Sequence, residues 1–318
     1  MNIAFIGVGG IAGAHMRNLA RIEGARVSAV YDVLRERAEQ AGRQYDATVA
    51  ESVEALLETR PDAVYVCVPP FAHGAVELAV LERGIPLFVE KPLAVDLEPA
   101  QAILGAVQSR GLLTAVGYHW RYSEAADAAL EALATRRAGM VMGYWMGTMP
   151  EVSWWRKMDQ SGGQMVEQTT HIVDLARYLV GEIAEVHACY GNRGIADFYE
   201  GVTVPDVGSL NLRFADGAVG TVMTTCLLDR NHAVGLDIVT RDLTLEIRDD
   251  ALTERGRTET RTRRNGTDPY FVEDQAFVAA VRTGDPRLIR STYQDAYETH
   301  RVTVAANQSA QSGQPVRL

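Results

Sequence analysis

The sequence predicts an α/β domain with a doubly wound parallel sheet, followed by an α+β domain with a large open, mostly antiparallel sheet. Three observations support this fold class: a glycine-rich turn after the first apolar segment, regular alternation of apolar strands with helices up to about residue 118, and consecutive strand-like segments after residue 181. Alternation is typical of a parallel sheet with right-handed crossovers, whereas consecutive strands with tight turns indicate an antiparallel or mixed sheet. We therefore expect two domains, residues 1–121 and 122–318, as the length of 318 residues also suggests.

Composition narrows the possible partners and the compartment. The chain has 31 Lys and Arg residues against 41 Asp and Glu, a net charge of −10, which disfavours nucleic acid and anionic membranes as partners. No apolar segment is long enough to span a bilayer, and the first strand leaves no room for a signal peptide. Cys67, Cys189 and Cys226 are too few and too scattered for a disulfide framework or a zinc site. We expect a cytoplasmic protein without a bound metal.

The first twelve residues carry a dinucleotide-binding pattern. The apolar run 3–6 is typical of a strand buried on both faces, and the G-x-G-x-x-A spacing follows it directly. The first glycine permits a tight turn, the second lets backbone approach a pyrophosphate, and the alanine lets the next helix pack closely on the strand. The N–H groups at the start of that helix would face the phosphates. The residues expected to bind cofactor here are Gly7, Gly9, Gly10, Ile11 and Ala12.

An acidic residue completes this pattern. Asp32 ends the second expected strand, residues 26–30, about 20 positions after the glycines. A carboxylate at this place holds the hydroxyl groups of a ribose and repels a 2′-phosphate, which favours NAD. Arg35 and Arg37 follow closely and leave NADP possible. The alternative is an ordinary βαβ turn with an incidental aspartate.

Two further motifs follow strand ends, where doubly wound sheets bind their ligands. Residues 69–73 (Pro-Pro-Phe-Ala-His) follow the strand 63–68, and residues 90–92 (Glu-Lys-Pro) follow the strand 85–89. Lys91 would thus lie at the mouth of the nucleotide crevice, where its ammonium can hydrogen-bond a substrate hydroxyl. The alternative is a surface lysine. His73, near a helix start, is more typical of a structural or capping histidine than of a catalyst.

A polar stripe occurs on a helix expected at residues 164–180. Glu167, His171 and Asp174 have i, i+4, i+7 spacing, which places them on one helical face. Carboxylates one turn away on either side can fix the tautomer of a histidine and stabilise its charged form, as a general base near neutral pH requires. The alternative is a hydrogen-bonded histidine in a helix interface.

Together with 117–122 (Gly-Tyr-His-Trp-Arg-Tyr), Trp155-Arg156 and Gly162-Gly163, these motifs resemble the Gfo/Idh/MocA family, which includes glucose–fructose oxidoreductase and inositol dehydrogenase. The resemblance implies an N-terminal Rossmann domain. It also implies that Lys91 and His171 are the catalytic pair, assisted by Glu167. Further cofactor-binding residues implied are Pro69, His73, Glu90 and Lys91. The implied substrate-binding residues are Lys91, His119, Arg121, Trp155, Arg156, Glu167 and His171.

Three positions depart from the family pattern. Glu167 stands where aspartate is usual, so the charge is kept but the reach is one methylene longer. Pro69 replaces a common threonine and His119 a common asparagine, both near the expected nicotinamide site. We expect these changes to alter substrate geometry more than the chemistry.

The function expected is an NAD(P)-dependent oxidoreductase that acts on a secondary alcohol of a sugar, cyclitol or related polyol. Two alternatives stay open: a glycosidase that retains its NAD, and a non-catalytic dinucleotide-bound sensor. An open sheet with one uncovered apolar face also predicts a homodimer or homotetramer formed through the second domain.

Overall fold

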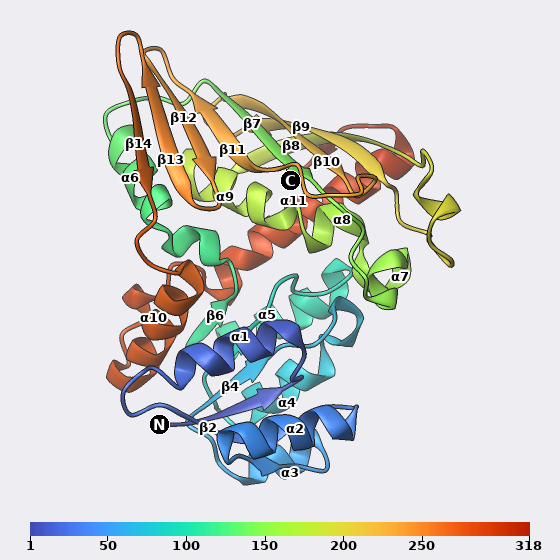
Figure 1. The fold of residues 1–318 in the computed structure, drawn as a ribbon, viewed down its shortest axis with the longest axis vertical. Helices are drawn as coiled ribbons and strands as arrows, with labels where there is room; N and C mark the ends of the chain where they lie inside the picture. The colour runs from blue at the N-terminus through green and yellow to red at the C-terminus, as the bar shows by residue number, and fades with distance from the viewer. The chain divides into compact units, whose positions relative to one another are not determined.

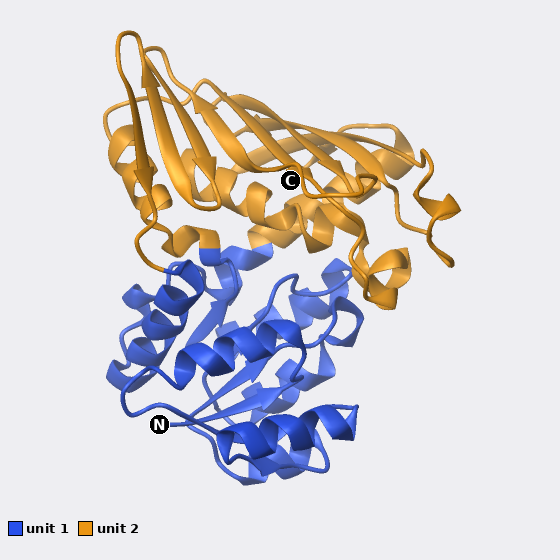
Figure 2. Cartoon of the chain, in the orientation of Figure 1, with its two compact units in different colours: residues 1–119, 268–297 blue, residues 120–267, 298–318 orange.

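The computed structural model describes residues 1–318, which form two compact units. One contains residues 1–119 and 268–297, and the other contains residues 120–267 and 298–318 (Figure 2). The expected domains, 1–121 and 122–318, put residues 268–297 in the second domain, whereas in the structure these residues belong to the first unit. The helix in that segment packs on the N-terminal sheet through Phe277 and Val278, a tertiary contact with no local sequence signal.

The first unit is built on a six-stranded parallel sheet with the order β3-β2-β1-β4-β5-β6 (Figure 1). This is the order of a doubly wound sheet. Strands are added to one side of β1 as far as β3 and then, from β4 on, to its other side. The fold class predicted for this half is confirmed. The strands are β1 (Asn2–Ile6), β2 (Arg26–Tyr31), β3 (Thr48–Val49), β4 (Ala63–Val66), β5 (Leu87–Val89) and β6 (Thr114–Val116). The α-helices are α1 (Gly10–Leu19), α2 (Arg35–Tyr45), α3 (Val53–Glu58), α4 (Ala75–Glu82), α5 (Leu97–Arg110) and α10 (Pro269–Thr283).

Helices cover both faces of this sheet, and alternate residues of β1 show how. Ile3 and Phe5 pack in one apolar cluster with α1, α2 and α10, whereas Ala4 and Ile6 pack in another with α3, α4 and α5. A strand buried on both faces needs a continuous apolar sequence rather than an alternating one. The two-sided cover therefore explains why β1, β4 and β5 have almost no polar residues.

The second unit contains a nine-stranded mixed sheet with the order β14-β13-β12-β11-β7-β10-β9-β8-β15. Only β7 and β10 pair in parallel; all other neighbours are antiparallel. The predicted large, mostly antiparallel sheet is confirmed. Its strands are β7 (Met140–Met146), β8 (Ile183–Gly191), β9 (Val207–Phe214), β10 (Val219–Thr225), β11 (Ala233–Val239), β12 (Leu243–Arg248), β13 (Ala251–Gly256), β14 (Thr260–Arg264) and β15 (Val316–Arg317).

One face of this sheet is covered by helices of the same unit. Residues of α6 (Glu124–Leu133), α9 (Thr170–Val180) and α11 (Tyr293–Ser312) share an apolar cluster with inward residues of the strands, and Figure 1 shows α9 and α11 along this face. Ala215, Asp216 and Gly217 form the turn that joins β9 and β10 as an antiparallel hairpin. The segment 255–264 is rich in arginine. It forms parts of two strands, β13 and β14, and β14 is the edge.

One expected element is divided in the structure. The helix predicted over residues 164–180 is two helices, α8 (Gly163–Glu167) and α9, separated at Gln168 and Thr169. The Thr169 N–H bonds the Gln164 carbonyl, five residues back, at 2.9 Å, and its hydroxyl lies 2.8 Å from that of Thr224 on β10. A local widening of this kind is common near functional sites. No helix in the structure is long and apolar enough to cross a membrane.

Candidate active site

The glycine turn after β1 has the geometry of a phosphate cradle. Gly7 has a φ of +83°, and a Cβ there would lie 2.5 Å from the Cys67 carbonyl oxygen, so no other residue fits. A Cβ on Gly9 or Gly10 would meet no atom within 4 Å, so the loop is open on that side. Gly9 caps α1 without any side-chain hydrogen bond. The first N–H groups of the helix therefore remain available for an anion.

Asp32 is fixed beside this turn. One carboxylate oxygen accepts the Val8 N–H at 2.9 Å and the other accepts the Leu34 N–H at 2.8 Å. Each oxygen has a second lone pair, so two ribose hydroxyls can still donate to this carboxylate. Arg35, considered above as a contact for a 2′-phosphate, pairs with Glu39 at 2.8 Å and with Glu51 at 2.5 Å. These two carboxylates compete with a phosphate for its guanidinium.

The motif after β4 forms a short 3-10 helix, η1 (Pro70–Ala72), preceded by Pro69. His73 follows it, and its Nδ1 lies 2.5 Å from Glu77 on α4. The other Glu77 oxygen accepts the Gly74 N–H at 2.7 Å. The side chains of His73 and Glu77 are inaccessible to solvent, so the histidine fixes the start of α4 through this pair.

The Glu-Lys-Pro motif follows β5 directly. The Glu90 carboxylate is buried: one oxygen lies 2.9 Å from Nε2 of His15, and the other accepts the Lys91 N–H at 3.1 Å. Lys91 is half-buried at the carboxyl end of the strand, where ligands of doubly wound sheets bind. Glu90 was assigned to the cofactor, but the contacts of its side chain are to His15 and to the backbone of Lys91.

His119 lies at the end of β6 in the same unit. Its ring stacks on Tyr270 of α10 with centroids 3.7 Å apart. Burial, with smaller effects of the Lys91 and His15 charges, lowers the pKa of His119 to about 3. The ring is therefore neutral at any physiological pH and can both donate and accept a hydrogen bond.

In the second unit, the division between α8 and α9 changes the relation of Glu167 to His171. Glu167 ends α8, and Oε2 accepts a hydrogen bond from Nε1 of the buried Trp155 at 2.6 Å. His171 lies in the first turn of α9, buried, with its ring stacked on Trp145 at a centroid distance of 5.9 Å. The i, i+4 argument for one continuous helical face therefore does not hold for Glu167.

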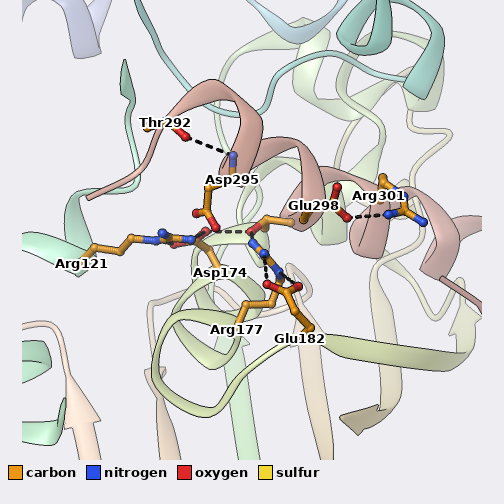
Figure 3. Close-up of polar contacts among 9 residues, drawn as sticks. Arg121, Asp174, Arg177, Glu182, Thr292, Asp295, Glu298 and Arg301 are labelled. Carbon is orange, nitrogen blue, oxygen red and sulfur yellow. Dashed lines mark hydrogen bonds and ion pairs between the residues drawn. The ribbon is translucent and has the colours of Figure 1, made fainter. Parts of the chain in front are cut away.

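Asp174, the third residue of the predicted stripe, is paired with Arg121. Nε and Nη2 of Arg121 each donate to a different Asp174 oxygen at 2.7 Å (Figure 3). Thr299 also donates to Asp174, at 2.8 Å, and accepts from Arg177, which binds Glu182 through two further hydrogen bonds. Arg121 was assigned to substrate, but its guanidinium faces Asp174 and lies over the Tyr178 ring at 4.8 Å. It anchors the helix that carries His171.

Sequence reasoning missed two residues of the first unit. His15 is completely buried between Glu90 and Asp274, with Nδ1 2.7 Å from Asp274. A signal for His15 existed, because it falls on the buried face of α1 with the apolar residues Ala12, Met16 and Leu19. No signal existed for Asp274, which lies 259 residues away on α10. In the second unit, the guanidinium of Arg156, also predicted to contact substrate, lies over the Tyr199 ring at 4.6 Å.

Comparisons with known proteins match both halves of the chain to models of one protein family. Residues 1–118 match the family model GFO_IDH_MocA, described as "Oxidoreductase family, NAD-binding Rossmann fold", and residues 135–247 match the GFO/IDH/MocA C-terminal domain. Together these matches cover more than half of the chain.

Individual relatives align over nearly the whole length. The scyllo-inositol 2-dehydrogenase (NAD(+)) of Bacillus subtilis strain 168 is 27% identical, over 99% of this chain and 95% of its own. An inositol 2-dehydrogenase of Rubrobacter xylanophilus is also 27% identical, over 99% of this chain and 92% of its own. The solved structure of levoglucosan dehydrogenase with NADH superposes with a TM-score of 0.89 at 22% identity, covering 100% of this chain and 98% of that one. This last likeness establishes the fold.

Proposed function

Because the chain belongs to the GFO/IDH/MocA family of NAD-binding oxidoreductases, we propose that it oxidises a secondary alcohol of a sugar, cyclitol or related polyol, with Lys91 and His171 as its catalytic residues. The observation that carries this proposal is the combination, in one chain, of an open glycine cradle with Lys91 at the carboxyl end of β5. The inositol 2-dehydrogenases aligned over 99% of the chain support the substrate class.

NAD fits the residues of the first unit. The open side of Gly9 and Gly10 and the uncapped start of α1 suit a pyrophosphate, and Asp32 suits an unphosphorylated ribose. When bound, NAD supplies an oxidised nicotinamide ring that can accept a hydride from an alcohol carbon. The paired state of Arg35 supports NAD over NADP.

The roles of the two catalytic residues follow from their chemistry. We assign to His171 the acceptance of the hydroxyl proton, because a neutral imidazole can take up a proton near neutral pH. We assign to Lys91 a hydrogen bond to the same hydroxyl oxygen, where an ammonium stabilises the negative charge that develops as the proton leaves. Trp155 holds the Glu167 carboxylate, which supports a role for Glu167 in fixing either His171 or a neighbouring substrate hydroxyl.

The experiment is a substrate panel followed through NADH absorbance. Purified protein is incubated with NAD or NADP and with scyllo-inositol, myo-inositol, levoglucosan or simple aldoses. Appearance of NADH with at least one polyol, faster with NAD than with NADP, supports the proposal. Cleavage of an aryl glycoside without net NADH would instead identify an NAD-retaining glycosidase. Binding of NADH with no turnover of any polyol would identify a sensor.

We also propose that the protein is a homo-oligomer, a homodimer or homotetramer, formed through the face of the large sheet that points away from α9 and α11. Large apolar residues are exposed there, including Met140 on β7 and Val219 and Met223 on β10. The register pairs Met140 with Val219 and Met223 with Tyr144, so these side chains form one continuous surface. Light scattering at micromolar concentration tests this proposal. A monomer contradicts it, and Met223→Glu is expected to shift an oligomer towards smaller species.

A further inference from the structure

A buried polar network in the first unit is hydrogen-bonded to the backbone of Lys91. It joins four elements of the unit, because α1 supplies His15 and Asn18, β4 supplies Tyr65, the end of β5 supplies Glu90, and α10 supplies Asp274. Helix α1, whose start carries the glycine turn, packs against α10 in this region (Figure 1). All five residues are almost or completely inaccessible to solvent.

His15 is the centre of this network. Its Nδ1 lies 2.7 Å from Asp274 and its Nε2 lies 2.9 Å from Glu90. Burial by itself would lower the pKa of His15, but the charges and hydrogen bonds of Asp274 and Glu90 outweigh burial and raise this pKa well above 6.5. The ring is therefore an imidazolium at neutral pH, and both nitrogens donate. Asp274 is fixed in turn by Asn18 at 2.9 Å and by Tyr65 at 3.1 Å.

Glu90 transmits this fixed position to the next residue. Its second oxygen accepts the Lys91 N–H at 3.1 Å, so one carboxylate joins α1 to the backbone of Lys91. The carboxylate also fills the space over Gly117 at the end of β6, because a Cβ on Gly117 would lie 2.4 Å from Oε1. The backbone after β5 is therefore held between α1 and β6 by a single buried side chain.

We propose that His15 is a positioning residue for Lys91: it holds the Glu90 carboxylate over Gly117, and this carboxylate fixes the Lys91 backbone so that the ammonium is directed to the reacting hydroxyl. The functional part of this inference rests on the proposed role of Lys91; the structural link from His15 to Lys91 does not.

The composition of the network favours positioning over simple stabilisation. A buried ion pair is seldom more stabilising than apolar residues of the same volume, because two charges must leave water. Here an imidazolium and two carboxylates replace apolar packing at the one strand end that carries Lys91. Geometric precision is what such a network supplies, and a misplacement of about 1 Å at a catalytic group can lower a rate by about a hundredfold.

The test measures Lys91 itself, without any substrate. Folded protein is labelled with acetic anhydride over a range of pH, and the rate of acetylation at Lys91 is followed by peptide mass spectrometry. Three variants break the link in different ways. His15→Asn removes the cation, and Glu90→Gln removes the negative charge and leaves one acceptor oxygen for two donors, His15 Nε2 and the Lys91 N–H. Gly117→Ala displaces the carboxylate while keeping every charge. Where His15→Asn fails to fold, Gly117→Ala still tests the proposal.

Two control variants separate positioning from stability. Tyr65→Phe removes one hydrogen bond to Asp274 but leaves His15–Glu90 intact. Gly105→Ala adds a methyl group in α5, where no atom lies within 4 Å. We expect the acetylation profile of Lys91 to shift in all three test variants and in neither control, even where Tyr65→Phe lowers the melting temperature. An unchanged Lys91 profile in folded Gly117→Ala and Glu90→Gln would overturn the proposal.

Activity then tests the functional part. With a polyol that the wild type oxidises, we expect kcat of Gly117→Ala to fall about tenfold to a hundredfold with little change in KM. The double variant His15→Asn/Glu90→Gln should lose no more activity than the worse single variant, because both act through one carboxylate. A wild type that oxidises no polyol would refute the proposed function and leave the acetylation result to decide the structural link.

Discussion

The Arg121 guanidinium donates two 2.7 Å hydrogen bonds to Asp174, three residues after His171 on the same helix. Both side chains are buried, and Thr299 gives the carboxylate a third donor. Asp174 therefore anchors α9 through Arg121 and Thr299. The Arg121–Asp174 pair thus fixes the helix that carries His171.

We expect Asp174→Asn to destabilise the protein strongly. Removing one partner of a buried pair leaves the other charge uncompensated, which typically costs about 3–5 kcal/mol of unfolding free energy. Urea denaturation followed by tryptophan fluorescence measures this change. Asp242→Asn is the matched control, because its pair with Arg136 lies at the surface and should leave the midpoint nearly unchanged. Equal midpoints for the two variants would contradict the anchoring role.

Lys91→Ala and His171→Ala are both expected to lose turnover, and His171→Ala should still bind NAD. Proton transfer by a positioned group contributes about a hundredfold or more in rate, and the cofactor contacts assigned above do not involve His171. Turnover with a polyol from the panel and NADH titration by fluorescence measure the two quantities separately. Loss of NADH binding in His171→Ala would show that this histidine belongs to the cofactor site instead.

Asp32→Ala is expected to weaken NAD binding and to reduce discrimination against NADP. A hydrogen bond to a charged group contributes about 1.5–3 kcal/mol, so NAD affinity should fall by about tenfold or more. Loss of the carboxylate also removes the repulsion of a 2′-phosphate. Titration of both cofactors by calorimetry measures the ratio. Tighter binding of NADP than of NAD by the wild type would refute the role of Asp32.

The raised pKa of His15 predicts a pH dependence of stability. The folded protein holds this proton more tightly than the unfolded chain, whose histidine titrates near 6.5. The stabilisation is therefore complete below that pH and is lost as the pH rises through the raised value. Urea denaturation at pH values from about 6 to about 10 should show this loss in the wild type and not in His15→Asn.

The groups around His15 do not obscure this measurement. Burial and then Asp274 raise the pKa of Tyr65, and burial and then Glu90 raise the pKa of Cys67, so both stay neutral in this window. His119 is neutral throughout, since its pKa is about 3. Asp274 and Glu90 face the ring from α10 and from the end of β5. A wild-type stability that rises from neutral to alkaline pH relative to His15→Asn would contradict the prediction.

The sequence by itself determined the local features of this protein. The apolar strands, the Gly7 turn, Asp32 at the end of β2 and Lys91 after β5 are all set by short-range rules of period, turn geometry and position relative to a strand end. These rules act within a few residues, so the features that they set can be recognised from the sequence alone.

Only the tertiary structure decided which polar groups are paired. Asp274 reaches His15 from 259 positions away, and Thr299 reaches Asp174 from 125. Hydrogen bonds with Thr224 and Gln164 accompany the division of the expected helix at Thr169. A buried charge requires a partner, and tertiary packing determines which residue is close enough to be that partner. The spacing of residues in the sequence does not show which residue this is.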